Sequence, residues 1–304
     1  MLYYIIIRNF LVRGEKMNCP DSRKISEINL FGTHDSLTAF VDMEKVCRCQ
    51  TLTLREQLAS GVRLIDVRLN RKKDGFYLVH SLADCYEDEE KKIPLSFSAV
   101  LRNCLDFLKE NPDEFIVMSV KQDRGIQSRF FFPAFYSQYI KGNEDKWYLS
   151  SEIPTVKECR GKIVLMRRCK VFPKYKKNTL CGLDFSHWRD QGKKWSEKIY
   201  PVRLSKTQKA TVQDRYGLAP ERKWHKCAKP FLDSCRCDGD NICVHFISTA
   251  YRYKNESLVR TAEEMNGYFK NYDLSESKGW FFFDFPDEDI AEKFTQGDNY
   301  GKER

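Results

Sequence analysis

Short apolar runs recur along the chain, and polar or turn-forming residues bound each of them. Runs of this length with such boundaries predict buried β-strands. The runs lie at residues 25–31, 62–68, 76–80, 115–120, 161–166, 242–247 and 280–285, and we interpret 211–216 as a short strand exit. The stretches 175–205 and 227–240 lack this pattern, so we interpret the first as a polar loop and the second as a loop insertion.

Helical signals lie between several of these runs. The segment TLRE at 53–56 is a capping box, which opens a helix that ends before Gly61. Apolar residues from Phe97 to Leu108 repeat at helical spacing, and Asn111-Pro112 ends that helix. The aromatic stretch 130–139 predicts a core-packed helix, and 286–289 start a closing helix. Strands and helices that alternate about eight times predict an α/β protein with a single (β/α) barrel over 25–304, preceded by a tail at 1–24.

Polar side chains follow or interrupt the apolar runs. The first is in GTHDS at 32–36, where a glycine allows a close backbone approach and a histidine precedes an aspartate. In a barrel the carboxyl ends of the strands meet at one mouth, where such folds carry their chemistry. We therefore expect these residues to converge: His34, Asp66, Arg68, His80, Lys121, Arg168, Asp214 and Asp284. By contrast, we interpret His245 as a core or supporting residue.

These residue types suit paired proton transfer at a phosphate. Imidazole titrates near neutral pH, so one of the two rings, His34 or His80, could accept a proton while the other donates one. The planar fork of Arg68 can bind two phosphate oxygens and stabilise charge on a five-coordinate phosphorus. A carboxylate behind a histidine holds its tautomer and stabilises its cation, and Asp35 and Asp284 are the candidates for that role.

Composition narrows the class of partner. Of 304 residues 41% are hydrophobic and 13% aromatic, which indicates a globular protein. The net charge of +9 favours anionic partners, although it is also compatible with ordinary solubility. The Lys and Arg residues are scattered, so we expect a phosphorylated substrate or an anionic lipid surface and no nucleic acid. We expect a monomer.

The twelve cysteines leave two interpretations open. Cys47 and Cys49, and also Cys235 and Cys237, form Cys-Arg-Cys pairs, with Cys227 and Cys243 near the second pair. A secreted chain would form disulfides from them, whereas a cytosolic one would keep them reduced or bind zinc, although no paired C-x-x-C spacing is present. The apolar run at 2–7 is too short to span a bilayer and lacks a clear cleavage site. With a weak glycosylation sequon at 255–257, the localisation stays open.

Seven segments in order resemble the bacterial-type phosphatidylinositol-specific phospholipases C (X-domain family). They are GTHDS at 32–36, GVRLIDVR at 61–68, LVH at 78–80, FIVMSVK at 115–121, GKIVLMRR at 161–168, TVQDRY at 211–216 and GWFFFDF at 279–285. Each segment is weak by itself, but the ordered series is specific. The resemblance implies a distorted TIM-type barrel that cleaves phosphatidylinositol, within a membrane surface, to diacylglycerol and inositol 1,2-cyclic phosphate. A glycosylated phosphatidylinositol anchor would be open to the same chemistry.

The resemblance also implies roles for individual residues. His34 would be the general base, oriented by Asp284, and His80 the general acid, supported by Asp35. Arg68 would bind the phosphate. Substrate contacts would come from Lys121, Arg168, Asp214, Tyr216 and Asp66, with Tyr216 stacked on the inositol ring.

We expect no metal and no cofactor. Calcium-dependent relatives place acidic or amide ligands on the second strand, where this chain has Arg68, whose cation would repel calcium and could replace its charge. The chain departs from the bacterial pattern at Ser81, where glycine is usual, at Phe31, where proline is usual, and in the cysteine-rich segment around Cys235. These departures bear on head-group specificity more than on the two histidines.

Two other functions remain open from the sequence. A glycerophosphodiesterase-like or sphingomyelinase-D-like enzyme also uses two histidines, but it needs magnesium held by acidic residues, so EDTA would abolish its activity. A catalytically silent inositide-binding protein would keep the pocket alone. The retained set of His34, His80, Arg68 and Asp284 argues against the silent protein.

Overall fold

Eight parallel strands form the centre of the computed structural model, which describes residues 19–178, 180–192, 199, 201–254, 256–275 and 277–295. In spatial order they are β8 (Leu183–Asp184), β7 (Ile163–Arg167), β5 (Ile116–Gln122), β2 (Leu64–Arg71), β1 (Leu30–Thr33), β12 (Trp280–Phe283), β11 (Asn241–Phe246) and β10 (Lys209–Gln213). Among the described residues no backbone ladder joins β8 to β10. The sheet therefore curls into a barrel that is open on this side.

Short strands extend the barrel at its edges. The strand β9 (Pro201–Arg203) runs antiparallel to β10, and β6 (Trp147–Tyr148) pairs with the first residues of β7. The hairpin partner β3 (Phe76–His80) pairs antiparallel with the end of β2 and with β4 (Ala83–Asp84).

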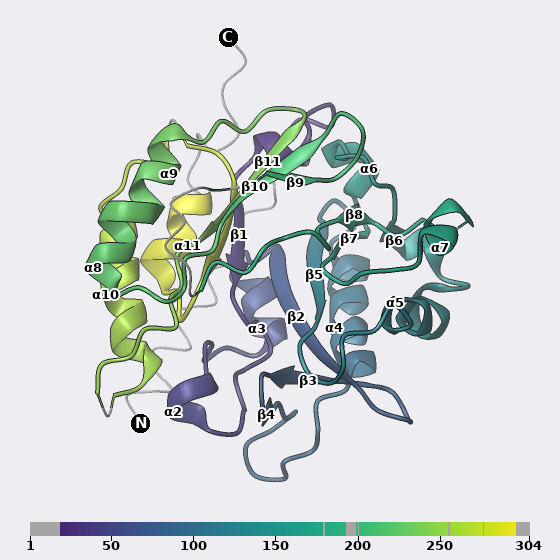
Figure 1. The fold of residues 1–304 in the computed structure, drawn as a ribbon, viewed down its shortest axis with the longest axis horizontal. Coiled ribbons are helices and arrows are strands. Elements are labelled where there is room, and N and C mark those ends of the chain that lie inside the picture. Colours follow the sequence, from purple (N-terminus) through teal and green to yellow (C-terminus); the bar gives the residue numbers. More distant parts are fainter. Residues whose placement is uncertain are drawn as a thin grey trace.

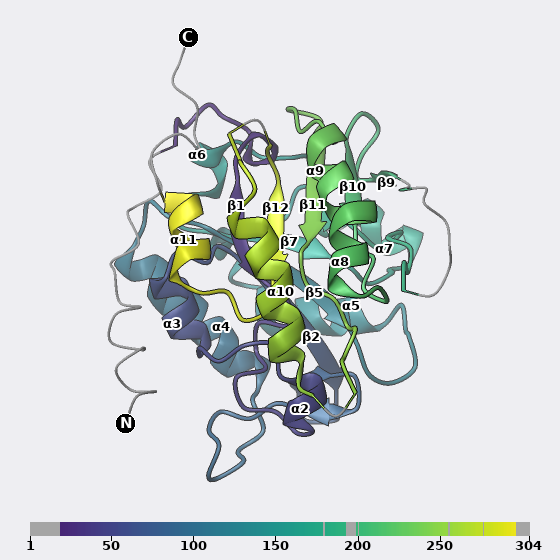
Figure 2. The same cartoon turned by 90° about the vertical axis from the view of Figure 1, so that its left-hand side faces the viewer.

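Helices cover the outside of the sheet. One group is α2 (Glu44–Cys47), α3 (Leu54–Ala59), α4 (Phe97–Glu110), α5 (Phe131–Phe135), α6 (Val156–Cys159) and α7 (Pro173–Asn178). The other is α8 (Pro220–Lys223), α9 (Lys229–Ser234), α10 (Leu258–Lys270) and α11 (Glu288–Thr295). Figure 1 shows α8 to α11 on the left of the strands and α4 to α7 on the right, and Figure 2 shows α10 and α11 in front of β1 and β12.

Shorter helical turns complete the chain. The turns η1 (Ile25–Glu27) and η3 (Glu144–Lys146) are 3-10 helices, whereas η2 (Tyr136–Ile140) and η4 (Trp224–Ala228) are π-helical continuations of α5 and α8. In the described part of the chain no helix is long and apolar enough to cross a membrane.

The core has two layers because successive side chains of a strand point to opposite faces. Leu30 and Trp280 belong to a buried cluster inside the barrel, whereas their neighbours Phe31 and Phe281 belong to a cluster shared with the helices. The single (β/α) barrel is thus confirmed. Gly32 allows β1 and β2 to lie close together, since a Cβ at this position would lie 2.7 Å from the Leu64 carbonyl oxygen.

Two strand predictions need correction. The run 76–80 is a strand, but it belongs to a hairpin rather than to the barrel, because β2 continues past the barrel edge and β3 folds back on it. The barrel strand that replaces it is β8, which lies inside the stretch interpreted as a loop. Two residues are too few to produce a periodic signal, so the pattern could not reveal β8.

Two further segments differ from expectation. The run 25–31 begins with the turn η1, where the backbone N–H of Lys24 donates to Glu27, and only its end enters β1. The first part of the supposed loop insertion, residues 227–234, continues a helix that begins at Pro220, whereas 235–240 form no helix, as expected of a loop. Trp224, Ala228 and Phe231 are buried at helical spacing there, so packing selects the helix.

The remaining predicted elements agree with the structure. The capping box opens α3, with the Thr53 backbone N–H donating to Glu56 at 2.8 Å, and the apolar face at 97–108 is buried in α4. The aromatic stretch forms α5 and η2, in which Phe131, Phe132 and Phe135 are buried as predicted. Residues 1–18 of the expected tail and Asn255 of the sequon lie outside the described residues.

Candidate active site

The candidate residues meet at the carboxyl ends of the barrel strands. The alternation that buries Leu64, Val117 and Trp280 inside the barrel also directs the polar residues that follow them toward its mouth. A cavity of about 550 Å³ opens there. Its lining comprises His34, Arg68, His80, Ser81, Lys121, Asp123, Arg168, Phe185, Trp188, Asp190, Asp214, Tyr216, Ser248 and Ala250.

His34 is held from behind by a carboxylate. Its Nδ1 lies 2.8 Å from Asp284 Oδ1, and since a carboxylate only accepts, the ring donates from Nδ1 and leaves Nε2 unprotonated in the neutral form. Burial lowers the pKa of His34, but Asp284 and Asp35 outweigh this and raise it above 6.5. Asp284 is nearly completely buried, so the interaction is poorly screened. Neutral His34 therefore has an unprotonated Nε2, and the residue lines the cavity.

His80 faces His34 across the cavity mouth. Its Nδ1 lies 2.7 Å from the Cys47 carbonyl oxygen, so Nδ1 carries a proton and Nε2 points inward. The two ring centroids are 6.3 Å apart, and the rings are nearly perpendicular, at 83°. The structure therefore brings together two residues that are 46 positions apart in the chain.

Asp35 lies between the two histidines. Its Oδ2 is 3.1 Å from His34 Nε2 and 3.3 Å from His80 Nε2. Its backbone adopts a left-handed φ of 42°, which aspartate tolerates better than most residues and which turns the carboxylate inward. We expected Asp35 behind His80, but its carboxylate lies next to Nε2 of that ring. The Cys47 carbonyl is behind His80 instead.

Arg68 joins this cluster through three contacts. Its Nε lies 2.9 Å from Asp35 Oδ1, and its Nη2 lies 3.0 Å from Asp66 Oδ2 and 2.7 Å from His34 Nε2. Burial alone would lower the pKa of Arg68, but Asp35 and Asp66 raise it well above its ordinary value. The guanidinium therefore stays charged and keeps one edge toward the cavity.

Asp66 is buried beneath the cavity and does not line it. Its Oδ1 lies 3.1 Å from Arg168 Nη1 and accepts from Ser119 Oγ at 3.2 Å. Burial raises its pKa, but Arg68 and Arg168 outweigh this and hold the pKa well below the usual range. Asp66 thus supports two guanidinium groups from below, instead of facing a ligand.

Two more cations flank the cavity. Lys121 is bonded to Asp123, and burial with nearby Arg68 and Arg168 lowers the pKa of the lysine. The Arg168 guanidinium lies 3.8 Å from the ring centroid of Trp188, in a cation–π contact. Together with Arg68, these residues give the cavity three fixed positive charges suited to a phosphate group.

Tyr216 and Asp214 form the opposite wall. Tyr216 donates to Asp190 Oδ1 at 2.6 Å, and burial together with that carboxylate raises the pKa of the phenol to about 12. The backbone N–H of Asp214 donates to Gln191 at 2.9 Å, which holds the strand exit in place. An aromatic face and a carboxylate on one wall suit a polyhydroxylated ring.

Sequence reasoning missed part of the cavity. Asp123 lies two residues after Lys121, and its Oδ2 accepts from the Ser81 backbone N–H at 2.8 Å. Ser81 itself has a left-handed φ of 54°, which explains why glycine suits this position in the resembling family. Asp190 and Trp188 lie in the polar stretch at 175–205. Of these residues, only Asp123 could have been predicted from the sequence, because it lies just after the end of a predicted strand.

Lys223 is another residue that the sequence analysis did not predict. This helix side chain is completely buried and donates to the Ser248 carbonyl oxygen beneath the cavity. Burial lowers the pKa of Lys223 to about 8, although the carboxylates of Asp214 and Asp284 act in the opposite direction. By contrast, His245 is a core residue, as expected, stacked on Phe281 with ring centroids 4.6 Å apart.

A metal ion would meet competition in the cluster. His34, Asp35 and Asp66 each offer a donor atom within 4.8 Å of the others. The same carboxylates already bind the Arg68 guanidinium at 2.9 and 3.0 Å. A divalent cation there would have to displace or approach a fixed positive charge.

Comparison with known families decides the family. The model of the phosphatidylinositol-specific phospholipase C X domain, PI-PLC X 1, matches residues 19–176. The chain belongs to this family. The expected resemblance is thereby confirmed.

Curated relatives agree with the assignment. A 1-phosphatidylinositol phosphodiesterase of Staphylococcus aureus strain Newman is 30% identical over 241 residues, which cover 76% of this chain and 73% of the relative. The protein of the same name from Listeria monocytogenes is 29% identical over 172 residues, which cover 53% of this chain. That match spans only half of the Listeria protein's length.

Solved structures of this family share the fold. A variant of the phosphatidylinositol-specific phospholipase C from Staphylococcus aureus matches with a TM-score of 0.76 at 22% identity, covering 96% of this chain and 99% of that one. The Listeria monocytogenes enzyme matches with a TM-score of 0.68 at 21% identity, covering 92% and 96%. This likeness confirms the distorted TIM-type barrel.

Proposed function

We propose that the chain is a phospholipase C that cleaves phosphatidylinositol to diacylglycerol and inositol 1,2-cyclic phosphate without a metal. The observation that carries the proposal is the pair His34 and His80, whose rings face each other at 6.3 Å across a cavity with three cations. The family assignment and the names of its bacterial relatives support the same substrate.

In the first step the inositol 2-hydroxyl attacks phosphorus. His34 Nε2 is the general base, because its Nδ1 proton is committed to Asp284. The new bond joins the 2-oxygen to phosphorus, and the hydroxyl proton passes to Nε2. Asp284 then stabilises the imidazolium that forms.

The leaving group requires a proton from the other side. Neutral His80 carries its proton on Nδ1, so it acts as an acid only in the imidazolium form, with Nε2 also protonated. Asp35 Oδ2 lies 3.3 Å from that nitrogen, where it can accept a hydrogen bond from the Nε2–H of this form. The proton goes to the glycerol oxygen as its bond to phosphorus breaks, which releases diacylglycerol. Water hydrolyses the cyclic product with the two roles reversed.

Arg68 stabilises the charge that develops on phosphorus. It is anchored by Asp35 and Asp66, so its orientation is set before the substrate binds. In our proposal Asp66 is a positioning residue, because it contacts Arg68 and Arg168 and does not line the cavity. Lys121 and Arg168 bind inositol hydroxyls.

The inositol ring would lie against the wall that Asp214 and Tyr216 form. Asp214 accepts from ring hydroxyls, and Tyr216 packs against the ring face. The phenol is already bonded to Asp190, so the aromatic face, rather than the hydroxyl, is the group available to the ring.

Exposed apolar residues beside the mouth would contact the lipid surface. Leu82 is 80% exposed and Ile126 is 91% exposed, and their loops are joined by the Arg124 Nε, which donates to the Ser81 carbonyl at 2.8 Å. Ser81 lines the cavity, so both apolar residues lie beside the route of the substrate. Exposed apolar groups of this kind bury in a membrane interface at a gain of about 25 cal/mol per Å².

Phosphorus NMR of phosphatidylinositol vesicles tests the proposal. With enzyme and excess EDTA we expect the cyclic phosphate signal first and the monophosphate signal later. His34→Ala and His80→Ala should each slow cleavage by about 10²- to 10⁴-fold, because each removes one proton transfer. His225→Ala, which removes an exposed histidine outside the cavity, should leave the rate unchanged.

The same experiment separates the alternatives. Activity that EDTA abolishes and magnesium restores would point to a metal-dependent phosphodiesterase. Binding to phosphatidylinositol vesicles with no new phosphorus signal would point to a silent inositide-binding protein. Full activity of His80→Ala would contradict the acid assignment.

A further inference from the structure

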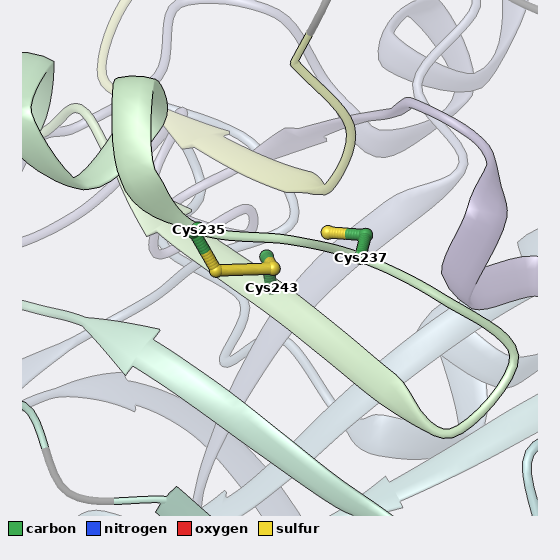
Figure 3. A group of neighbouring side chains, drawn as sticks. All are labelled: Cys235, Cys237 and Cys243. Atoms are coloured by element: carbon green, nitrogen blue, oxygen red, sulfur yellow. A yellow bond between two sulfur atoms is a disulfide. The ribbon is translucent and has the colours of Figure 1, made fainter.

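Three cysteines gather on the outer face of the barrel, at the amino-terminal end of β11. Cys235 follows the last residue of α9, Cys243 lies on β11, and Cys237 lies in the segment between them (Figure 3). Their sulfur atoms all lie within 4.8 Å of one another. Cys235 and Cys243 are joined as a disulfide, whereas Cys237 is a free thiol.

The third thiol has no role in the disulfide, but it is oriented by its surroundings. Cys237 Sγ donates to the Lys278 carbonyl oxygen at 3.0 Å, and the Asn241 side-chain amide lies 3.7 Å from Cys243 Sγ. Burial raises the pKa of Cys237 to about 12, with a smaller rise from Asp238, while the Cys243 backbone N–H and Lys278 oppose it. The thiol therefore keeps its proton until a cation replaces it.

The other cysteines bear on the redox state of the chain. All twelve cysteines lie in the described part of the chain, where Cys235 and Cys243 form a disulfide and eight of the other ten are buried. A chain that uses cysteines as a disulfide framework would pair most of them. The Cys235–Cys243 bond is thus an exception in a thiol-rich protein, and its reduced form would place three thiols at one point.

We propose that, once reduced, Cys235, Cys237 and Cys243 form a zinc-binding site with three protein ligands. Zinc prefers thiolate sulfur at about 2.3 Å, which puts ligand sulfurs about 4 Å apart. Cys237 already lies within 4.8 Å of both other sulfurs, and reduction of the Cys235–Cys243 bond would let those two sulfurs separate to this distance. No other His, Cys, Asp or Glu of the described residues joins this group of donors. Cys235 and Cys237 are half-buried, so water can occupy the fourth position.

The two states differ by a balanced reaction. A phosphine reductant takes the oxygen of one water molecule and converts the disulfide to two thiols, while the phosphine becomes its oxide. Zinc then displaces the three thiol protons and binds as a trithiolate with a net charge of −1. Lys278, whose charge favours the Cys237 thiolate, partly balances that charge.

The position of the site indicates a structural role. It joins the end of α9 to the outer face of β11 and lies beside the Lys278 segment that leads into β12. The cavity lies at the carboxyl ends of the strands, at the opposite end of β11. Zinc would therefore stabilise the packing of α9 on the barrel instead of taking part in the reaction at the cavity.

Titration of the full chain with cobalt and zinc tests the site. After reduction with a phosphine, we expect one metal per chain, a thiolate-to-cobalt charge-transfer band and displacement of cobalt by zinc. At free zinc 100 times the Kd, the unfolding constant of the reduced protein should fall about 100-fold. Metal affinity should fall steeply as the pH is lowered, because three protons compete with the metal.

Matched variants locate the ligands. Cys237→Ser should weaken zinc binding by more than the ~10- to 100-fold typical of losing an outer-shell partner. Cys227→Ser replaces another partly exposed cysteine that forms no disulfide, in η4, and should bind zinc as the wild type does. The oxidised Cys237→Ser protein keeps the Cys235–Cys243 bond, so its melting temperature checks that it folds. Absence of metal from the reduced wild type, or equal affinity of Cys237→Ser, would overturn the proposal.

Discussion

Asp284→Asn isolates what the carboxylate contributes to His34. The substitution keeps an oxygen acceptor 2.8 Å from Nδ1 but removes the negative charge in a nearly completely buried position. A hydrogen bond to a charged group contributes about 1.5–3 kcal/mol, and a neutral one about 0.5–1.5 kcal/mol. The difference of about 1–2 kcal/mol acts on the imidazolium formed during the reaction, so kcat should fall by about 5- to 30-fold.

The pH profile gives the second readout of this variant. The acid limb of kcat/KM reports the base of the free enzyme, which must be neutral to accept a proton. Asp284 raises the pKa of His34, so Asp284→Asn should lower that pKa and move the acid limb to lower pH. At acid pH the variant should therefore lose less of its own maximal activity than the wild type does.

Vesicle cleavage followed by phosphorus NMR across the pH range measures both effects. The matched control is Asp287→Asn, three residues further along, where the carboxylate is half-exposed and bonded to Lys270. It should change neither kcat nor the acid limb. An acid limb that stays in place or moves upward in Asp284→Asn, with kcat unchanged, would refute the assignment of His34 as the base held by Asp284.

Three other predictions follow from the same contacts. Arg68→Ala should lower kcat more than it weakens vesicle binding, and a larger loss of binding than of kcat would contradict this. It should also lower the unfolding free energy, measured with denaturant, by about 3–5 kcal/mol, because it leaves buried carboxylates unpaired. Leu82→Gln and Ile126→Gln should each weaken vesicle binding about tenfold through lost apolar burial, and turnover of a water-soluble substrate should be unchanged. An equal loss of activity on vesicles and on the water-soluble substrate would exclude a membrane role for these residues. Folding raises the pKa of His34 above 6.5, so protonated His34 stabilises the folded protein. The extra stability of the wild type over His34→Gln should be fully present below pH 6.5 and should disappear as the pH rises through the higher native pKa. A difference between the two melting temperatures that grows at alkaline pH would contradict this prediction.

Much of the fold follows from local pattern. Strand runs such as 115–120 and 280–285 were predictable because a buried strand needs only a few consecutive apolar residues. The helix at 97–110 was predictable because its apolar face repeats over three turns. The hairpin of β3 and the short strand β8 were not predictable, since partner and direction of pairing depend on segments distant in the sequence.

Some residues of the site could likewise be predicted from the sequence, and others could not. His34, Arg68 and Asp284 could be identified from the sequence because each is a polar residue that follows or interrupts an apolar run. Asp190 and Trp188 could not be identified, because they reach the cavity from an irregular segment that only tertiary packing brings to Tyr216 and Arg168. The place of Asp35 between two histidines also depends on tertiary contacts.

The sequence by itself determined which residue types stand at the ends of the strands, because the alternation of a strand is a local property of the chain. Only the tertiary structure decided which of them meet. The 6.3 Å between His34 and His80, the support of two arginines by Asp66 and the gathering of Cys235, Cys237 and Cys243 all join separate segments of the chain. Such distances follow from how the sheet curls and how helices pack on it, which no short stretch of sequence encodes.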